Sequence, residues 1–318
     1  MSAETKNENR LKTGSALQSL GSLIALVGLV VVFSIISTDF RSFNNILALL
    51  KQASVNGLIA FGMTGVILTG GIDLSVGSTL ALTSMLCAAM VHGGVPPVVA
   101  MLAVLVLGVV FGAASGALIT KGRLQPFIAT LITMTVFRGL TMIFSGGMPI
   151  SNLGNDPFLT GIGKGTLLFI PVPVWVMLAM FALFFFVLNK TTFGRRVYAT
   201  GSNEKAAKLA GVNVNRTKLL VYIVSGVTAT LAGLILLSRL SSAQPTIGTG
   251  YEMDAIAAVV LGGTSMSGGR GKIYGTLVGV IIIAVLNNGL NIMNVSSYYQ
   301  DVVKGLVILL AVLSDRKR

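Results

Sequence analysis

Long apolar runs separated by short polar connections cover almost the whole chain. Runs of spanning length lie at about 18–36, 53–69, 74–91, 97–119, 126–144, 173–189, 218–237, 273–288 and 299–313. A helix of about 20 apolar residues crosses the hydrocarbon layer of a membrane. A further apolar piece, Met253 to Gly262, has only about half that length and is expected to be short or re-entrant. The pattern predicts an all-α polytopic membrane protein with about ten passes, residues 18–313, between polar tails at 1–17 and 314–318.

One apolar region is interrupted by the polar residues 68–77. Gly70 and Gly71 can end one helix, and Asp73 suits the N-cap of the next, because its carboxylate can accept the free N–H groups of a first helical turn. Irregular backbone at membrane depth requires cover from protein or from a water-filled path. Asp73 and Ser75 are therefore candidates for a translocation pathway or gate. The alternative is an ordinary capped turn at the membrane surface.

A second interruption follows the half-length run. An apolar stretch leads to Gly262 and Gly263, and a further apolar run begins after Lys272. This order of helix, glycine pair and helix weakly echoes residues 55–80. Internal repeats with interrupted helices are typical of transporters, which favours a transport function. The glycine-rich run lacks the G-x-x-x-x-G-K-[ST] spacing of a phosphate loop.

Basic residues are distributed unevenly between the connections, and the net charge is +13. If the N-terminus is cytoplasmic, 17 of the 23 Lys and Arg residues fall in cytoplasmic segments. Short cytoplasmic loops of membrane proteins carry an excess of Lys and Arg, so this split predicts that both termini are cytoplasmic. It also accounts for the positive charge without a nucleic-acid partner.

The connection over residues 190–218 is expected to be cytoplasmic and is the most basic part of the chain. Within it, Ser202 or Asn203 can cap a short amphipathic helix that Gly211 can end. Its apolar positions are mostly small, which suits docking into a protein cleft better than deep insertion into lipid; the alternative is a helix resting on lipid headgroups. Residues 145–172 should form a long outer loop that could receive a partner, or a disordered connector.

Several polar residues are expected inside the apolar runs. Asn287 and Asn291 lie four apart on one helix face, with Asn288 beside them. Amides can bond a neutral polyhydroxy solute along a translocation pathway, and they can equally hold helices together. Asp301 and Lys304 are three residues apart and can neutralise each other.

The remaining chemistry-bearing residues argue against an enzyme. Cys87 is the single cysteine and His92 the single histidine, so we expect no disulfide framework, no metal site and no catalytic residues. No nucleotide-binding motif is present, so active transport would need a separate ATPase. Arg138 is expected to snorkel or to bond backbone carbonyls near the outer end of its helix.

Five stretches together resemble the sugar permeases of bacterial ATP-binding-cassette importers, specifically the ribose type. They are residues 71–77, 194–211, 241–271, 287–291 and 295–300. The resemblance covers nearly the whole chain except the N-terminal tail. The combination is highly specific for the family and less specific for the sugar.

The resemblance implies a permease for a monosaccharide, with ribose as the expected sugar, in a bacterial cell (inner) membrane. It implies a second permease copy, most simply in a homodimer, two ATPase subunits inside and a sugar-binding protein outside. ATP is then used by the ATPase, and this chain carries no cofactor. Residues 201–211 match the segment that couples such permeases to the ATPase. The implied coupling residues are Gly201, Asn203, Glu204, Ala206, Ala207 and Gly211.

An ion-coupled secondary carrier of a small polar solute is the alternative within transport. It would work without a partner and would place an ion site near Asp73 or Asp301. The basic loop 190–218 argues against it, because a carrier needs no surface for an ATPase.

Overall fold

The chain folds almost entirely into helices, which confirms the predicted all-α class. The computed structural model describes residues 21–154 and 156–316. The apolar runs correspond to the helix over Gly21–Ile36 and to α2 (Phe43–Leu68), α3 (Val76–His92), α4 (Pro97–Thr120), α5 (Pro126–Ser145), α7 (Val172–Lys190), α10 (Val214–Leu240), α11 (Tyr251–Leu261), α12 (Ile273–Ile292) and α13 (Ser297–Arg316). Within the described residues, six of these helices are long and apolar enough to cross a membrane: α2, α4, α5, α7, α10 and α12.

Shorter elements occupy the connections. They are η1 (Asp39–Arg41), α6 (Pro157–Lys164), β1 (Thr166–Leu167), β2 (Ile170–Pro171), α8 (Thr192–Ser202) and α9 (Glu204–Leu209). The long loop over 145–172 thus contains a helix and an antiparallel hairpin in its described part, so a disordered connector is wrong. The loop over 190–218 holds two helices where the sequence indicated one, because α8 continues directly from α7 after Thr191.

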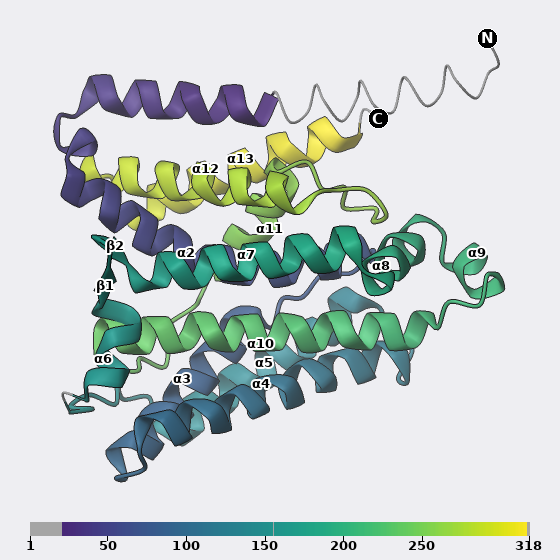
Figure 1. The fold of residues 1–318 in the computed structure, drawn as a ribbon, viewed down its shortest axis with the longest axis horizontal. Helices are drawn as coiled ribbons and strands as arrows, with labels where there is room; N and C mark the ends of the chain where they lie inside the picture. Colours follow the sequence, from purple (N-terminus) through teal and green to yellow (C-terminus); the bar gives the residue numbers. More distant parts are fainter. Residues whose placement is uncertain (1–20, 155, 317–318) are drawn as a thin grey trace.

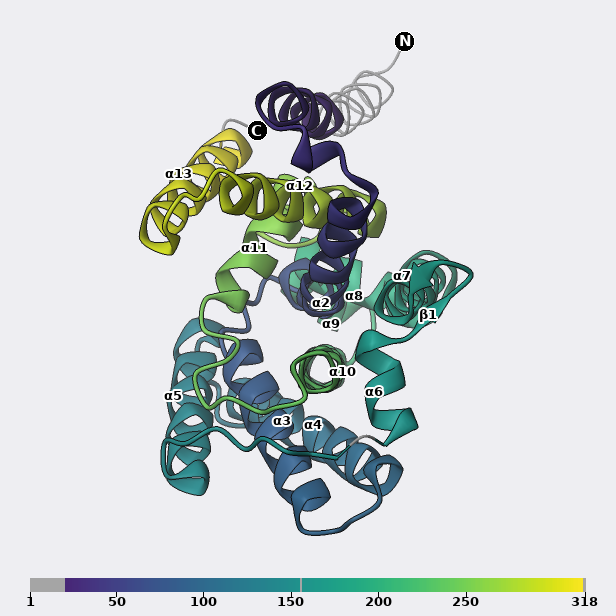
Figure 2. The same cartoon turned by 90° about the vertical axis from the view of Figure 1, so that its left-hand side faces the viewer.

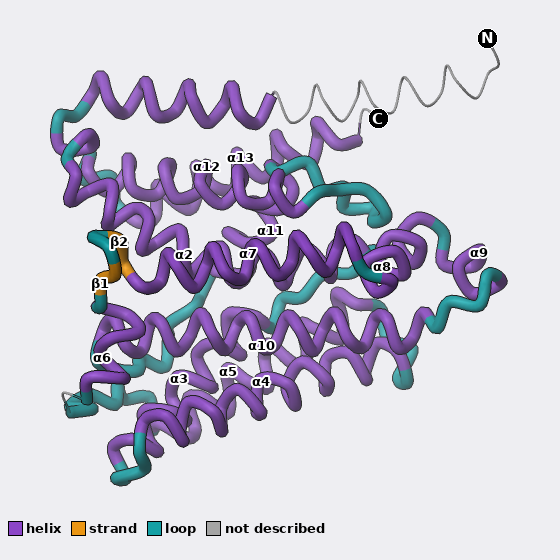
Figure 3. The backbone as a smooth tube through the Cα atoms, viewed as in Figure 1, coloured by secondary structure: helices purple, strands orange, loops and turns teal. Residues whose placement is uncertain are grey.

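The helices run lengthwise through one bundle, and the connections gather at its two ends (Figures 1 and 3). One end carries α8, α9, the α4–α5 turn and the loop between α11 and α12. The end of α13 lies toward this same end (Figure 1). The opposite end carries α6 and the β1–β2 hairpin. The basic connections therefore share one end, as the charge distribution requires, while the side of the membrane on which they lie stays a prediction.

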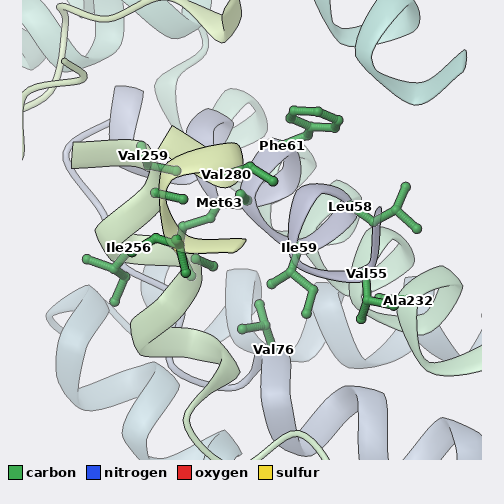
Figure 4. Close-up of a cluster of buried hydrophobic side chains, with 14 of the residues drawn as sticks. Val55, Leu58, Ile59, Phe61, Met63, Val76, Ala232, Ile256, Val259 and Val280 are labelled. Carbon is green, nitrogen blue, oxygen red and sulfur yellow. The ribbon is translucent and has the colours of Figure 1, made fainter. Parts of the chain in front are cut away.

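The centre of the bundle is formed by α2, α10 and α12. Within the most apolar window of each helix, 67%, 67% and 78% of their residues are buried, against 33%, 28% and 28% for α4, α5 and α7. A helix that is apolar on all sides needs cover from other helices or from lipid, and other helices cover most of these three. Side chains of α2, α3, α10, α11 and α12 meet in this core (Figure 4).

Close packing of α4 against α10 depends on glycine. Gly108, Gly112 and Gly116 recur every four residues along α4 and face α10. A methyl group on Gly112 would lie 2.4 Å from the carbonyl oxygen of Tyr222, which is closer than atoms can approach. Small residues at this spacing let two membrane helices approach backbone to backbone. The contact anchors α10 between the core and the outer helices.

Two helices begin inside the bundle instead of at its ends. α3 follows the irregular residues 69–75, and α11 follows a segment of turns over 241–250 that passes back from the end of α10 (Figure 2). A methyl group on Gly77 would lie 2.2 Å from the Gly248 carbonyl oxygen, so the first turn of α3 touches this segment. With 11 residues, α11 is about 16 Å long, roughly half of a membrane span. The short element predicted over 253–262 is therefore confirmed.

Candidate transport site

Asp73 lies among packed helices, where only 1% of its surface is exposed. Its Oδ1 accepts hydrogen bonds from the Ser75 backbone N–H at 3.0 Å and from Ser75 Oγ at 2.6 Å. Its Oδ2 accepts a hydrogen bond from Ser225 Oγ of α10 at 2.7 Å. A carboxylate removed from water needs such donors to offset its lost hydration. The carboxylate is therefore buried against other helices, while the depth of this turn in the membrane stays a prediction.

Asp73 is not the N-cap of α3, so that part of the prediction is wrong. The helix begins at Val76, with Ser75 at the N-cap position and no cap bond from the Ser75 side chain. Leu74 and Ser75 extend the turn before helical geometry starts, so the carboxylate reaches the N–H of Ser75 and not the first helical turn. Asp73 instead closes a local turn and fastens the break to α10.

Neighbouring helices cover the irregular backbone between α2 and α3. The carbonyl oxygen of Ile72 accepts hydrogen bonds from Thr130 Oγ1 of α5 and from the Tyr222 hydroxyl of α10, both at 3.2 Å. Ser75 Oγ lies 3.5 Å from Ser115 Oγ of α4. The break is thus tied to three helices and is satisfied by protein groups, as backbone at membrane depth must be.

The three asparagines of α12 have three different partners. Asn288 exchanges two amide hydrogen bonds with Asn45 of α2, at 2.8 and 2.9 Å. Asn291 accepts a hydrogen bond from Gln300 of α13 at 2.8 Å. Asn287 donates to Asp254 of α11 at 3.3 Å. Each of these contacts holds two helices together, so the helix-pinning interpretation has direct structural support, and a role in the pathway stays a prediction.

A buried carboxylate on α11 was missed by sequence reasoning. Asp254 is 5% exposed, and its Oδ1 lies 3.4 Å from Lys304 Nζ of α13. The expected Asp301–Lys304 pair is confirmed at 3.5 Å, but Lys304 is shared between both carboxylates. Asn287 Oδ1 is buried beside this cluster without a hydrogen-bond partner among the described residues. The acidic residue at the start of a half-length apolar run was the signal that could have identified Asp254.

The capping of α9 agrees with the sequence. The Asn203 side chain accepts a hydrogen bond from the Ala206 N–H at 3.0 Å, which makes it the N-cap. At the other end, Gly211 has a φ of +81°, and its N–H and that of Val212 bond back to Lys208 and Ala207. This pair of bonds around a left-handed residue is the usual glycine stop of a helix.

The side chains of α9 differ from expectation in two ways. Glu204, one of the implied coupling residues, is already paired within the chain, because Lys208 and Lys218 bind one of its carboxylate oxygens each at 2.7 Å. Ala207 is 5% exposed because it packs against this chain itself, so it cannot form an outer contact face. Leu209 is 91% exposed and forms the apolar projection of this end of the molecule.

Hydrogen bonds from Lys208 and then from Lys218 lower the pKa of Glu204 below its ordinary value of 4.5. Because the folded-state pKa is lowered, the contribution to stability is present above the ordinary value and is lost only as pH falls through the lowered pKa. The contact between α9 and α10 therefore persists throughout the neutral range.

Gly201 connects the α9 region to both interrupted segments. A methyl group on Gly201 would lie 1.8 Å from the Leu68 carbonyl oxygen and 2.5 Å from the Gly269 nitrogen. The Gly269 N–H in turn donates to the Leu68 carbonyl at 2.9 Å. The end of α8, the end of α2 and the loop before α12 thus meet backbone to backbone. We call Leu68, Gly201 and Gly269 the glycine junction.

A polar cavity of about 410 Å³ lies where α3, α5 and α11 meet. Its polar lining consists of Ser78, Thr135, Arg138, Thr249 and Glu252. The expectation that Arg138 bonds backbone carbonyls is confirmed, because its Nη1 donates to Pro245 and Ile247 at 2.9 Å each. Sequence reasoning did not connect these residues, because Arg138 and Glu252 are brought together only by the returning segment 241–250.

Among the described residues, no group of three or more His, Cys, Asp or Glu side chains is arranged to hold a metal ion. The buried ionic groups have hydroxyl, amide or lysine partners instead.

Comparison with known proteins defines the class. Residues 45–312 match the family model of the branched-chain amino acid transport system permease component. The ribose import permease protein of Bacillus subtilis (strain 168) is 56% identical over 98% of this chain and 97% of its own length. That of Escherichia coli (strain K12) is 50% identical over the full length of both. The L-arabinose transport system permease protein of Escherichia coli (strain K12) is 37% identical, covering 95% and 92%. No solved structure was found to match.

The matched region and the helical bundle define a transport permease. The chain belongs to the family of branched-chain amino acid transport system permease components. Its ribose-type resemblance is confirmed, and it is a multi-pass protein of the bacterial cell (inner) membrane. Its relatives are transport subunits and not enzymes.

Proposed function

We propose that this chain is the membrane permease of an ATP-binding-cassette importer for ribose. The observation that carries the proposal is its identity of 50–56% to ribose import permeases over nearly their whole length. Permeases described for D-allose and L-arabinose are 39% and 37% identical. Ribose is therefore favoured over other sugars as the substrate. A sugar is also favoured over a branched-chain amino acid, although the description of the wider family names branched-chain amino acids.

A separate ATPase would dock on α9. Its exposed Leu209 offers an apolar anchor, and burial of a leucine side chain contributes roughly 1.5–3 kcal/mol. Lys205 and Lys208 surround it with positive charge. The ion pair between Glu204 and Lys218 connects α9 to α10, so a displacement of Leu209 by the ATPase would move both helices together. In this proposal the partner uses ATP, and the chain itself takes no cofactor.

The glycine junction would carry movement of α8 and α9 into the bundle. Its contacts join Gly201 to the end of α2, five residues before Asp73. Coupling requires an element that two sites both bias between two arrangements. The break over 69–75 suits this role, because hydrogen bonds from the hydroxyl groups of Ser225 and Tyr222 connect it to α10. Asp73 and Ser75 are thus assigned to a gate.

A second copy of the chain would cover the face formed by α5, α11 and α13, which lie along one side of the molecule (Figure 2). This face exposes the Asp301 side chain to 75% and Met253 to 49%, and Thr135 is exposed beside the polar cavity. Polar and charged groups facing lipid are costly, so another protein surface is favoured there. A homodimer would place the two polar cavities toward each other.

A sugar-binding protein would dock at the opposite end from α9. The β1–β2 hairpin presents Leu168 and Phe169, which are 74% and 86% exposed. The helix α6, which directly precedes this hairpin in the chain, is attached to α10, because its Leu159 carbonyl accepts a hydrogen bond from Ser238. An ordered, partly apolar surface on a rigid base is suited to a protein partner.

Deletion of the gene followed by uptake assays tests this proposal. We expect ribose uptake at micromolar concentrations to be lost and to return with a plasmid copy, while leucine uptake stays unchanged. Loss of leucine uptake with intact ribose uptake would show that the substrate follows the wider family and not the ribose permeases.

A further inference from the structure

The polar cavity between α3, α5 and α11 combines a few polar and charged side chains with a largely apolar wall, as small-molecule pockets usually do. Its volume of about 410 Å³ falls within the range of roughly 300–1,000 Å³ that is usual for small-molecule pockets. Three hydroxyl-bearing side chains, one guanidinium and one carboxylate line it, together with Met134, Met142 and Gly139 of α5. Arg138 and Glu252 are both partly buried there.

Arg138 is fixed on one wall of this cavity. Both of its hydrogen bonds to backbone carbonyls use Nη1. Two hydrogen bonds from one nitrogen use at most two of the five N–H donors that a guanidinium carries. The side chain is therefore held in position while part of its donor capacity remains available to a ligand.

Glu252 lies on another wall, at the start of α11. Its Oε1 accepts the Gly250 N–H at 3.3 Å, and a methyl group on Gly77 would lie 2.5 Å from its Oε2. The carboxylate therefore sits beside the first turns of both α3 and α11, where free backbone N–H groups favour a negative charge. Arg138 and Glu252 line one cavity, yet they form no ion pair within the described part of the chain.

We propose that this cavity is a sugar-contact site of the translocation pathway, in which Arg138 donates and Glu252 accepts hydrogen bonds from a neutral polyol. This inference rests on the proposed function and assigns the residues that meet the solute. A sugar hydroxyl is both donor and acceptor, so it can satisfy an acceptor-only carboxylate and a donor-only guanidinium together. The opposite charges balance, so the site favours a neutral solute over an ion.

The position of the cavity agrees with this role. It lies where two helices begin inside the bundle, and substrate sites of transporters are typically formed at such interrupted helices near the membrane midplane. Ser78 of α3 and Thr249 of the returning segment both reach it, so movement of either interrupted segment would change its shape. The gate residue Asp73 lies five residues before Ser78 in the same segment.

Protection of an introduced cysteine tests contact with the sugar. In a Cys87→Ala background, Thr135→Cys places a thiol in the cavity, and Lys121→Cys places one on the exposed α4–α5 turn as a control. In lipid nanodiscs containing the whole complex, we expect millimolar D-ribose to slow labelling of Thr135→Cys several-fold. L-leucine should have no effect, and Lys121→Cys should react equally throughout. Equal labelling of Thr135→Cys with and without ribose would overturn the proposal.

A second measurement uses Glu252→Gln, which keeps the size of the side chain and removes its charge. We expect ribose uptake to fall about tenfold, the effect of weakening a hydrogen bond to a charged group, with unchanged membrane abundance. Asp39→Asn removes one negative charge from an exposed carboxylate on η1, outside the cavity, and should retain uptake. Wild-type uptake by Glu252→Gln would reject the site, whereas absence of ribose uptake by the wild-type complex would reject the proposed function itself.

Discussion

Several buried polar side chains in this protein hold helices together through partners that are distant in the sequence. Asp73 bonds Ser225, which is 152 residues away, and Asn288 bonds Asn45, which is 243 residues away. The sequence shows which residues are polar within apolar runs, because composition is a local property. It does not show which helix supplies the partner, because that depends on packing. This is why Asp73 was predicted as important while its role as a helix cap was wrong.

Asp73 offers a test at the scale of one residue. Asp73→Leu leaves the donors of Ser75 and Ser225 buried without an acceptor, at a cost of about 1–3 kcal/mol for each unsatisfied group. Asp73→Asn keeps one carbonyl oxygen as an acceptor and should lose less. We expect the melting temperature in detergent to decrease in the order wild type, Asn, Leu. A leucine variant as stable as the wild type would show that these hydrogen bonds do not hold the break to α10.

Helix lengths and interruptions were predicted well, because each depends on residues close in sequence. A run of apolar residues specifies a helix of matching length, and a glycine with a neighbouring cap residue specifies its end. α8 escaped prediction because its sequence is polar and carries no apolar stripe long enough to be recognised. The cavity with Arg138 and Glu252 escaped because it is formed by a segment that turns back into the bundle.

The glycine stop of α9 gives a test at the scale of the element. Nothing lies within 4 Å of a methyl group placed on Gly211, so its φ of +81° is the sole constraint on substitution. Asn tolerates this conformation, whereas Val is strained by about 1–2 kcal/mol. We expect Gly211→Asn to retain the co-purifying ATPase and Gly211→Val to lose much of it at equal membrane abundance. Equal losses of the co-purifying ATPase in both variants, or no loss in either, would show that the backbone conformation at residue 211 does not control ATPase binding.

The anchor on α9 can be tested independently of its backbone. Leu209→Ser removes the exposed apolar side chain without touching a packed residue, so stability should change by less than about 0.5 kcal/mol. We expect ATPase co-purification and ribose uptake to fall together. Leu168→Ser makes the same change on the hairpin at the opposite end and should leave ATPase binding intact. Full ATPase binding by Leu209→Ser would show that the ATPase docks on another surface of the chain.

At the scale of the whole molecule, the charge distribution and the fold agree on which connections lie together. The basic turns and α9 occupy one end of the bundle, opposite α6 and the hairpin (Figure 1). We expect Lys205→Cys to be inaccessible to a membrane-impermeant thiol reagent in intact cells, and Lys164→Cys on α6 to react. Reaction of Lys205→Cys from outside would reverse the predicted orientation.

Reconstitution of the permease in sealed liposomes tests the central claim most directly. The vesicles would contain the permease with its ATPase inside, and the ribose-binding protein would be supplied outside with radiolabelled D-ribose. We expect ribose to accumulate only when ATP, the ATPase and the binding protein are all present, and to remain unaffected when ion gradients are collapsed. Ribose accumulation by the permease alone, driven by an ion gradient without ATP, would contradict the account and identify an ion-coupled carrier.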